Sequence, residues 1–529
     1  MRQVERRRAA LGLTAAIALA PALAQASPVL FVGRDEALRT SRVTQVALLR
    51  DGDRTVVSIA SDYEGPPQDF AMVVPVPRVV RARDVKVLPP ELFDRVDALT
   101  APRLVELWER DPCDDAPDYR ISAYSVDGAI VPVAKDPRDR PVSFEPGVIV
   151  DAQLAVGEYE IATLSARSSL GVEAWLRARG YQVPEGVAEA LRSYVQRGMK
   201  FLVANVDVDK VRRDASGRVR LSPLRFHYDD PIFRIPVVVG LPSAADAHDM
   251  FLYVLARGVR YQVAEYDNIV IPTNLDVRDA VREGFARFYA ALFNEIVQEF
   301  PDAIVTEYTW STASCDPCPV EPLNVHELAA LGLDALPAYR RWFVHPRTTS
   351  ELRLGATLVL TRLHARFSGR SRGHDMVLKA GLSIVGGHER WSDDTWISHG
   401  YLSVLDAGDA FQARYVVRHP WRGPIECEAP RPGRWGLSPA GDASTLTTAS
   451  ADELAFAEPD APLERSLVTE RRRIHVRPMR TYDGRPLPES LPSCRVDDTA
   501  PPRGALLLGL FAAVGRRRSR NDARDRRVA

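Results

Sequence analysis

The sequence predicts an α+β fold, in which mixed β-sheets combine with several short helices and one long helix near residues 277–300. Two observations support this class. Runs rich in β-branched residues alternate irregularly with runs that have a helical spacing of apolar residues, without the regular order of a doubly wound sheet. The composition is that of a globular protein, with 46% hydrophobic and 26% charged residues, and there is no internal repeat.

The first predicted elements are a β-hairpin and a buried strand. Two β-rich runs, 44–50 and 54–61, are joined by Asp51-Gly52, a dipeptide typical of tight hairpin turns, which need positive φ. Residues 70–76 are almost entirely apolar and predict a third strand, buried on both faces.

Helices separated by a strand are predicted next. Residues 90–108 have a helical pattern, which Pro102 divides into two pieces. A strand at 159–164 is followed by helices at 168–180 and 184–198. Each of these helices has a polar residue or proline at its start and a glycine at its end.

The longest predicted helix covers residues 277–300. Its apolar residues recur every three or four positions and therefore lie on one face, and Pro301 ends it. A further helical pattern covers residues 325–342. The remaining strands are predicted at 201–208, 233–239, 352–367 and 411–417.

The first 26 residues have the pattern of a secretory signal peptide. Arg6-Arg7-Arg8 precede an apolar run, and Ala24 and Ala26 provide the small residues of a cleavage site. A buried first helix would need polar residues spaced along this run, which has almost none. We therefore expect cleavage after Ala26 and a mature chain that folds outside the cytoplasm.

The last segment, residues 494–529, predicts a C-terminal sorting signal. Cys494 precedes a short apolar run, 504–515, that is followed by Arg516, Arg517 and Arg518. This run is shorter than the roughly 20 residues of a membrane-spanning helix. The arrangement resembles the MYXO-CTERM sorting signal, which implies cutting near the cysteine by a sorting protease and attachment at the outer surface. The alternative is a weak membrane tail.

Between the two ends the sequence predicts an ectodomain at 27–436, with possible internal boundaries near residues 150 and 350. A polar linker or stalk follows at 437–493, where Pro, Gly, Ser, Thr and Asp are frequent. The ectodomain is mildly acidic because both ends of the chain hold an excess of arginine. Binding to nucleic acid is therefore not expected.

Four cysteines in the ectodomain predict disulfides, because their number is even and the expected compartment is oxidising. Three connectivities are possible among Cys113, Cys315, Cys318 and Cys427. The CxxC motif also occurs in thiol oxidoreductases, whose first cysteine lies at a helix N-terminus. Here prolines follow the motif and the next helical pattern begins only at residue 325, so we favour structural pairing.

One polar strand face is a weak candidate for a ligand pocket. Arg362, His364 and Arg366 alternate along a predicted strand and therefore share a face. With His374 and Asp375 nearby in the sequence, this face could form an anion pocket, or it could carry ordinary ion pairs.

A second weak candidate is a turn at Arg418-His419-Pro420-Trp421. Here an aromatic and two basic groups on a rigid turn could bind a ligand. The alternative is that this segment locks the end of a strand, with Trp421 packed as part of the core.

The HExxH, Walker-loop and GxGxxG motifs of common metalloproteases and nucleotide-binding proteins do not occur in the sequence. A zinc site would need a second pair of close ligands beside the CxxC motif. Asn205, Asp207 and Asp209 have the spacing of calcium ligands, but Lys210 and Ser216 stand where an EF-hand needs Gly and Glu. No catalytic residue, metal or cofactor is therefore predicted.

Several further segments carry a family resemblance: Gly65–Pro77, Ala101–Glu106, Asp111–Cys113, Leu221–Phe226, Ile271–Asn274, Cys315–Pro319, Leu360–His364 and Arg418–Trp421. In number and order they resemble the bacterial domain of unknown function 2330 family, over about residues 28–436. Members often begin the mature chain with Cys-Gly, where this chain has Ser27-Pro28. The resemblance implies a shared organisation and no particular activity.

The sequence therefore favours an exported, surface-anchored protein that acts as a non-enzymatic binding or structural module of the cell envelope. One alternative is an envelope thiol oxidoreductase that uses Cys315 and Cys318, and another is a hydrolase with carboxylates on facing strands. The expected partners are the export machinery, a sorting protease and, through the C-terminal segment, the membrane. The sequence indicates no particular partner at the cell surface.

Overall fold

The computed structural model describes most of the chain between residues 27 and 468. The described residues are 27–34, 39–64, 69–114, 138–140, 143–145, 147–213, 219–243, 248–337, 358–367, 374–392, 395–398, 401–404, 408–436, 438, 446–457 and 462–468. All of them belong to one compact unit. The predicted signal peptide and sorting segment lie outside these residues.

Among the described residues, seven strands form an antiparallel sheet that we call the first sheet. Its order is β1-β4-β11-β10-β9-β7, and β8 pairs with β9. The bounds are β1 Leu30–Gly33, β4 Phe70–Val76, β7 Arg138–Arg140, β8 Ser143–Glu145, β9 Val148–Val156, β10 Tyr159–Ala166 and β11 Lys200–Val206.

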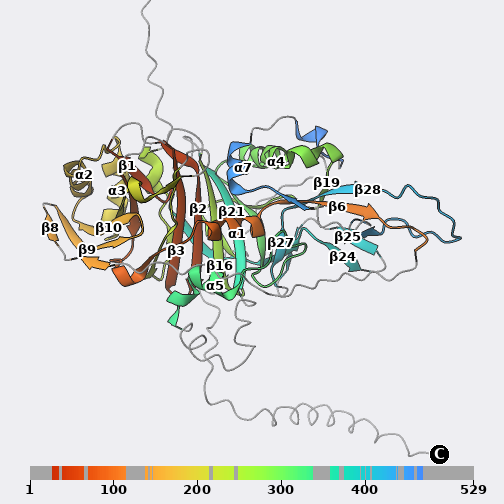
Figure 1. Cartoon of the computed structure of the whole chain (residues 1–529), viewed down its shortest axis with the longest axis horizontal. Coiled ribbons are helices and arrows are strands. Elements are labelled where there is room, and N and C mark those ends of the chain that lie inside the picture. The colour runs from red at the N-terminus through yellow and green to blue at the C-terminus, as the bar shows by residue number, and fades with distance from the viewer. Residues whose placement is uncertain are drawn as a thin grey trace, which may run out of the picture. The chain divides into compact units, whose positions relative to one another are not determined.

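A larger, mixed second sheet has thirteen strands among the described residues, in the order β12-β13-β3-β2-β16-β21-β20-β27-β23-β26. The strands β14 and β18 pair with β3 and β20, and β5 pairs with β14. Figure 1 shows β3, β2, β16 and β21 at its centre. The bounds are β2 Arg39–Asp51, β3 Arg54–Glu64, β5 Val85–Val87, β12 Arg212–Arg213, β13 Val219–Arg220, β14 Leu224–Asp229, β16 His248–Arg257, β18 Asn268–Val270, β20 Ile304–Ser311, β21 Leu358–Phe367, β23 Ser383–Gly386, β26 Tyr401–Val404 and β27 Ala410–Gln412.

Three smaller sheets complete the described strands. One has the order β19-β28-β6-β29, with β30 also paired to β6; the second has the order β15-β22-β17; the third joins β24 and β25. The bounds are β6 Arg103–Glu109, β15 Arg234–Ile235, β17 Tyr261–Ala264, β19 Leu275–Asp276, β22 Met376–Ala380, β24 Glu389–Ser392, β25 Thr395–Ser398, β28 Arg414–His419, β29 Trp435–Gly436 and β30 Leu446–Thr448.

The helices are short apart from α4. The α-helices are α1 Glu91–Thr100, α2 Ser169–Ala178, α3 Val187–Gln196, α4 Phe285–Glu299, α5 Val325–Ala330 and α7 Ala451–Phe456. The 3-10 turns are η1 Ala82–Asp84, η2 Val208–Lys210, η3 Val238–Ser243, η4 Asp279–Gly284, η5 Leu333–Ala335 and η8 Leu463–Arg465. Among the described residues, no helix is both long enough and apolar enough to cross a membrane.

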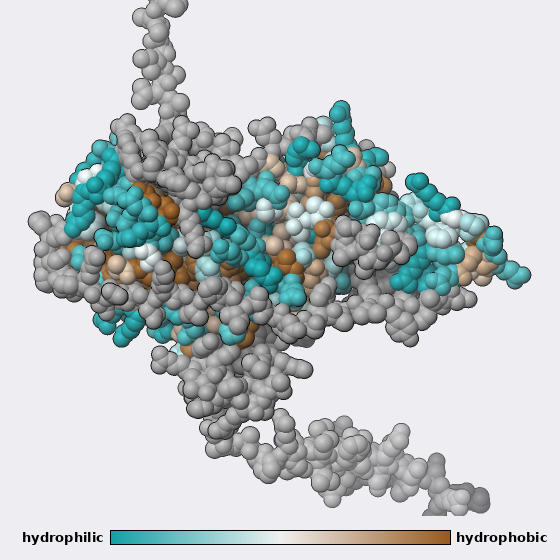
Figure 2. All heavy atoms as spheres, in the orientation of Figure 1, coloured by the Kyte–Doolittle hydropathy of each residue, from teal (hydrophilic) through white to brown (hydrophobic). Residues whose placement is uncertain are grey.

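Alternation along the strands produces four layers. In β16, Met250 and Leu252 belong to a core between the two sheets, whereas Phe251 and Tyr253 belong to a core between the second sheet and the helices α1, α4, α5 and α7. The outer face of the first sheet packs on α2 and α3. Because successive side chains of a strand point to opposite faces, one strand serves two cores. Polar residues cover most of the coloured surface in Figure 2, with smaller apolar patches between them.

The predicted α+β class is confirmed, and several elements lie where the sequence places them. The hairpin of β2 and β3 turns at Gly52, which has φ of 57°. Ser168 caps α2 by accepting a hydrogen bond from the backbone N–H of Gly171. The strand predicted at residues 70–76 has the same bounds in the structure.

Several predictions of elements were wrong in part. The helix predicted at 325–342 ends at Ala330, and a 3-10 turn follows at Leu333–Ala335. Residues 103–109 form strand β6, not a second piece of helix, because Pro102 ends the helical region and β28 pairs with this segment. The long helix begins at Phe285, after a 3-10 turn that starts at Asp279. In the segment 233–239, only Arg234–Ile235 is a strand.

The folded unit crosses the possible boundaries near residues 150 and 350. Both large sheets take neighbouring strands from the two sides of these positions, such as β4 with β11 and β20 with β21. It also includes part of the range predicted as a stalk. There β30 pairs with β6, and Leu454, Leu463 and Leu467 are buried, so the packed body extends at least to this last leucine. Residues 469–493 lie outside the described part.

Candidate functional site

Among the described residues, a dense group of ionisable side chains lies on the helix-facing side of the second sheet, beneath α1 and α4. Strand β21 places Arg362, His364 and Arg366 on this face, as the sequence predicts. Arg362 is 0% exposed and His364 is 1% exposed. We call the six side chains that meet here the buried charge cluster: Asp97, Asp249, Glu307, Arg362, His364 and Arg366.

Arg362 joins two carboxylates from different elements. Its Nε donates to Glu307 Oε2 of β20 at 2.6 Å, and its Nη1 donates to Asp97 Oδ1 of α1 at 2.5 Å. The guanidinium carbon lies 4.6 Å from the centre of the Phe251 ring, within the range of a cation–π contact. These two charge-assisted hydrogen bonds connect α1 to the second sheet.

His364 lies between two aromatic rings and two carboxylates. Its ring stacks on Phe251 of β16 at 4.1 Å and on Phe293 of α4 at 3.8 Å between ring centres. Nδ1 lies 2.7 Å from Glu307 Oε1, and Nε2 lies 3.6 Å from Asp249 Oδ2. When His364 is protonated, the cluster holds three cations and three anions and is neutral overall.

The remaining contacts extend the cluster to neighbouring elements. Arg366 donates two hydrogen bonds to Asp249, at 2.6 and 2.7 Å. Tyr289 of α4 donates to Glu307 at 2.7 Å, and Tyr253 of β16 donates to Asp97 at 2.9 Å. Asp97 also accepts the backbone N–H of residue 451, the first residue of α7, at 2.9 Å. The cluster therefore links helices α1, α4 and α7 to strands β16, β20 and β21.

Electrostatics in the cluster favour the charged forms. Burial by itself would raise the pKa of Glu307, but His364 and Arg362 outweigh it and lower that pKa. Burial would likewise lower the pKa of His364, yet Glu307 and Asp249 raise it above its ordinary value. Burial would raise the pKa of Asp249, but the hydrogen bonds from Arg366 and the nearby His364 imidazole outweigh it and lower that pKa. All three groups are therefore expected to be charged at mildly acidic pH.

The carboxylates of the buried charge cluster neutralise its basic side chains. An external anion would have to displace Glu307, Asp97 or Asp249 from the cations and would need a path through the covering helices. Among the described residues, no group of His, Cys, Asp and Glu is arranged to hold a metal ion. The geometry supports a structural role, in which buried ion pairs and hydrogen bonds connect six elements.

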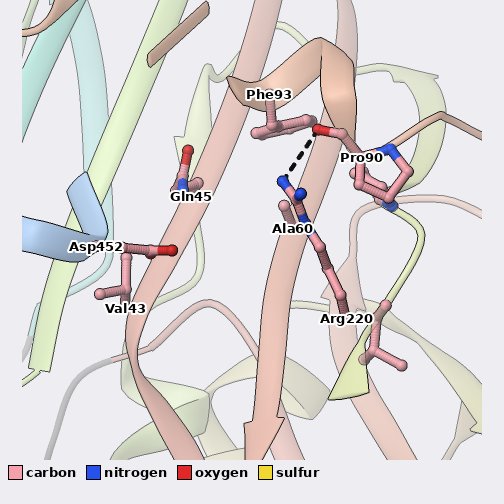
Figure 3. Close-up of a pocket in the computed structure, with 9 residues that line it drawn as sticks. Val43, Gln45, Ala60, Pro90, Phe93, Arg220 and Asp452 are labelled. Carbon is pink, nitrogen blue, oxygen red and sulfur yellow. Dashed lines mark hydrogen bonds between the residues drawn. The ribbon is translucent and has the colours of Figure 1, made fainter. Parts of the chain in front are cut away.

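A small pocket opens near the same helices. Figure 3 shows residues that line it, among them Gln45 of β2, Phe93 of α1, Arg220 of β13 and Asp452 of α7. A dashed line marks the hydrogen bond from Arg220 to the carbonyl of Pro90, at 3.4 Å. Its volume of about 30 Å³ has room for one or two water molecules and not for an organic substrate.

The turn at residues 418–421 lies apart from the buried charge cluster, at the end of β28. His419 stacks on Trp108 with 4.4 Å between ring centres and is 2.7 Å from Glu106. Arg418 donates to Asp276 at 2.8 Å. Trp421 is half-buried, and its backbone N–H donates to a glutamate of β6 at 3.0 Å. These contacts fasten the strand to its neighbours, and the structure brings no part of this turn to β21.

The four cysteines of the described residues form two disulfides in the structure. Of the three connectivities that the sequence left open, it has Cys113 with Cys427 and Cys315 with Cys318. The second pair lies in the loop between β20 and α5 and not at a helix N-terminus. The predicted processing and sorting residues lie outside the described part of the chain: Ala24, Ala26, Cys494, Arg516, Arg517 and Arg518.

Sequence reasoning missed the anionic half of the cluster. Glu307 lies in a strand of otherwise β-branched, aromatic and small polar residues, and a lone carboxylate in such a run was a signal that a buried cation faces it. Asp97 and Asp249 gave no comparable signal, because each stands in a segment where an exposed charge would fit equally well.

Fold and site together define a four-layered α+β protein whose helices are held to a mixed sheet by a buried charge cluster. A model of the family described as "uncharacterized protein conserved in bacteria (DUF2330)" matches residues 21–378. Because this match covers more than half of the 529 residues, the chain belongs to that family. Searches among curated proteins and among solved structures found no match.

Proposed function

We propose that this chain is an exported protein held at the outer cell surface, and that its body serves there as a non-catalytic binding or structural module. In this proposal a signal peptide is removed after Ala26, and the segment from Cys494 onward anchors the protein after a sorting protease has cut it. The export machinery, that protease and the membrane are the partners this requires.

The observation that carries the proposal is the Cys113–Cys427 disulfide. It joins residues 314 positions apart, and the two Cα atoms lie 5.5 Å from each other. Disulfides of this kind form and persist in oxidising compartments and are rare in the cytosol. The bond closes the end of the small sheet, where β28 from late in the sequence pairs with β6 from early in the sequence.

The surroundings of the CxxC pair support a structural role for it. Cys315 is only 5% exposed. The carbonyl of Pro317 accepts a hydrogen bond from buried Arg103 at 2.7 Å, and the carbonyl of Asp316 accepts one from buried Gln412. A redox cysteine needs an exposed thiolate in an electropositive site, commonly at a helix N-terminus. Here two side chains hold the loop by its backbone and no helix begins at the cysteine.

Export is tested in the bacterium that encodes the protein. The expected result is a chain that begins at Ser27 and is cut near Cys494, is accessible to protease on intact cells, and holds Cys113 and Cys427 oxidised. A Cys494→Ala variant is expected to keep its C-terminal segment. Recovery of the intact polypeptide in the cytosol, with its first 26 residues attached, would overturn the proposal.

Alkylation separates the binding module from a thiol oxidoreductase. In the purified, folded protein we expect Cys315 and Cys318 to resist iodoacetamide and to exchange no thiol with glutathione. A thiol of low pKa at this pair, exchanging with glutathione while Cys113–Cys427 stays intact, would instead support the enzyme and contradict a non-catalytic body.

A further inference from the structure

The residue that follows the predicted cleavage site is fixed inside the folded body. Ser27 is only 7% exposed. Its backbone N–H donates to the carbonyl of Val237 at 3.0 Å, and its own carbonyl accepts from Gly240 at 3.1 Å. Its hydroxyl accepts the backbone N–H of Val29 at 3.3 Å. Three hydrogen bonds therefore hold a single residue at the very start of the described chain.

The slot that receives Ser27 is shaped by a glycine. A Cβ atom placed on Gly240 would lie 2.5 Å from the Ser27 Cβ and 2.7 Å from its carbonyl oxygen. Because such distances are far inside van der Waals contact, only glycine allows this close approach. The opposite wall is also fixed, since the backbone N–H of Val237 donates to Asp375, which is paired with Arg197 at 2.7 Å.

The residues that follow Ser27 are also buried and hydrogen-bonded within the body. Residues 27–33 are all buried, and β1 pairs along its length with β4. The carbonyl of Gly33 accepts from the backbone N–H of Gln182 at 2.7 Å. A peptidase binds several residues on both sides of the bond that it cuts, in extended and accessible form. In the folded protein, the residues after this bond have their backbone groups engaged within the body.

From this geometry we infer that removal of the leader precedes folding, so that the chain crosses the membrane unfolded and the Ala26–Ser27 bond becomes protected once β1 has docked. This inference rests on the proposed export of the chain. In the cleavage step, water adds to the carbonyl carbon of Ala26, the C–N bond breaks, and the nitrogen of Ser27 takes up a proton. The resulting ammonium group donates to Val237 as the backbone N–H does in the structure.

The test compares native and unfolded precursor as substrates of a purified bacterial signal peptidase in detergent micelles. Full-length precursor is folded with both disulfides formed, and half of it is unfolded in urea and diluted directly into the assay. A synthetic peptide of residues 18–32 shows whether the enzyme accepts this leader. We expect the peptidase to cut both the peptide and the unfolded chain. The native precursor should be cut at least about 100-fold more slowly, because cleavage must wait until β1 opens.

Two glycine variants test the same protection in folded precursors. A Gly240→Ala precursor cannot seat Ser27 and should be cut faster than the native wild type, whereas Gly408→Ala, where a Cβ meets nothing within 4 Å, should not. Equal rates for native and unfolded wild-type precursor would overturn the inference and leave export untouched. Failure to cut even the peptide would instead remove the predicted signal peptide, and the inference with it.

Discussion

At the scale of single residues, Glu307 is the carboxylate that connects Arg362 to His364 in the buried charge cluster. It is 0% exposed and accepts from Arg362 and Tyr289, and it lies 2.7 Å from the imidazole of His364. A carboxylate without these donors would be very costly to bury. Removing its charge would leave three cations against two anions inside the protein, and breaking a buried pair in this way costs more than never having built it.

The first prediction concerns this carboxylate. Glu307→Gln keeps the size of the side chain and removes its charge, and we expect it to lower the free energy of unfolding by about 3–5 kcal/mol. Urea denaturation at pH 6 measures the effect, with exposed Glu283→Gln as the matched control, for which a change below about 0.5 kcal/mol is expected. A loss at Glu307 no larger than the control would show that the cluster contributes little to stability.

The second prediction is a dependence on pH. Because the pKa of His364 is raised above 6.5 in the folded state, its contribution is complete below pH 6.5 and is lost as the pH rises through the folded value. The pKa values of Glu307 and Asp249 are lowered, so their contributions are present above about pH 4.5 and are lost as the pH falls through the folded values. The cluster therefore stabilises the fold most between about pH 4.5 and 6.5.

Urea unfolding from pH 5 to 9 checks this dependence. The wild type should lose stability above pH 6.5, and a His364→Gln variant should lack that slope. Exposed His326→Gln serves as the control and should keep it. Parallel curves for wild type and His364→Gln would mean that another group causes the dependence.

At the scale of elements, the sequence was most informative where local chemistry decides the structure. The turn at Gly52 and the cap at Ser168 depend on neighbouring residues alone, and alternation along β21 correctly placed Arg362 and His364 on one face. The sequence could not show which carboxylates contact these two side chains. Glu307 lies more than fifty positions away from Arg362 in sequence, and Asp97 lies more than two hundred and fifty positions away.

Strand β6 shows how distant partners override a local pattern. Leu104, Leu107 and Trp108 fit a helical spacing nearly as well as a strand, and Pro102 alone could mark a kink as easily as an end. The strand forms because β28 pairs with it in parallel, and β29 and β30 pair with it from other parts of the chain. None of these partners can be identified from the local sequence.

The third prediction tests whether α7 belongs to the folded body. Leu454 is 2% exposed and lies in the core beneath this helix, next to α4, which Figure 1 shows beside it. Leu454→Ala should lower the free energy of unfolding by about 2–5 kcal/mol, as for other buried leucines. Leu170→Ala, at a position that is 68% exposed, is the matched control and should change it little. If Leu454→Ala and Leu170→Ala both have only small effects, α7 does not belong to the folded body, and the prediction of a stalk in this range stands.

At the scale of the whole molecule, strands from late in the sequence complete two of the sheets. The first sheet takes its strands from the N-terminal part of the described chain, whereas the second sheet and the small sheet around β6 need strands that follow residue 357. Such pairings over long sequence separations carry a high entropic cost before they form. A cross-link between distant segments reduces this cost, and Cys113–Cys427 provides one where β6 and β28 meet.

The fourth prediction compares the two disulfides by the lengths of the loops they close. Their sequence separations are 314 and 3 residues. The chain-entropy relation gives about 5–6 kcal/mol for the long loop and about 2 kcal/mol for the short one. Cys113→Ser with Cys427→Ser should therefore cost the protein more stability than Cys315→Ser with Cys318→Ser, measured by urea unfolding of folded, oxidised samples at one pH. If the short loop costs more, the Cys315–Cys318 bond acts mainly through the packing of its loop against Arg103 and Gln412, and the entropic view of this fold is wrong.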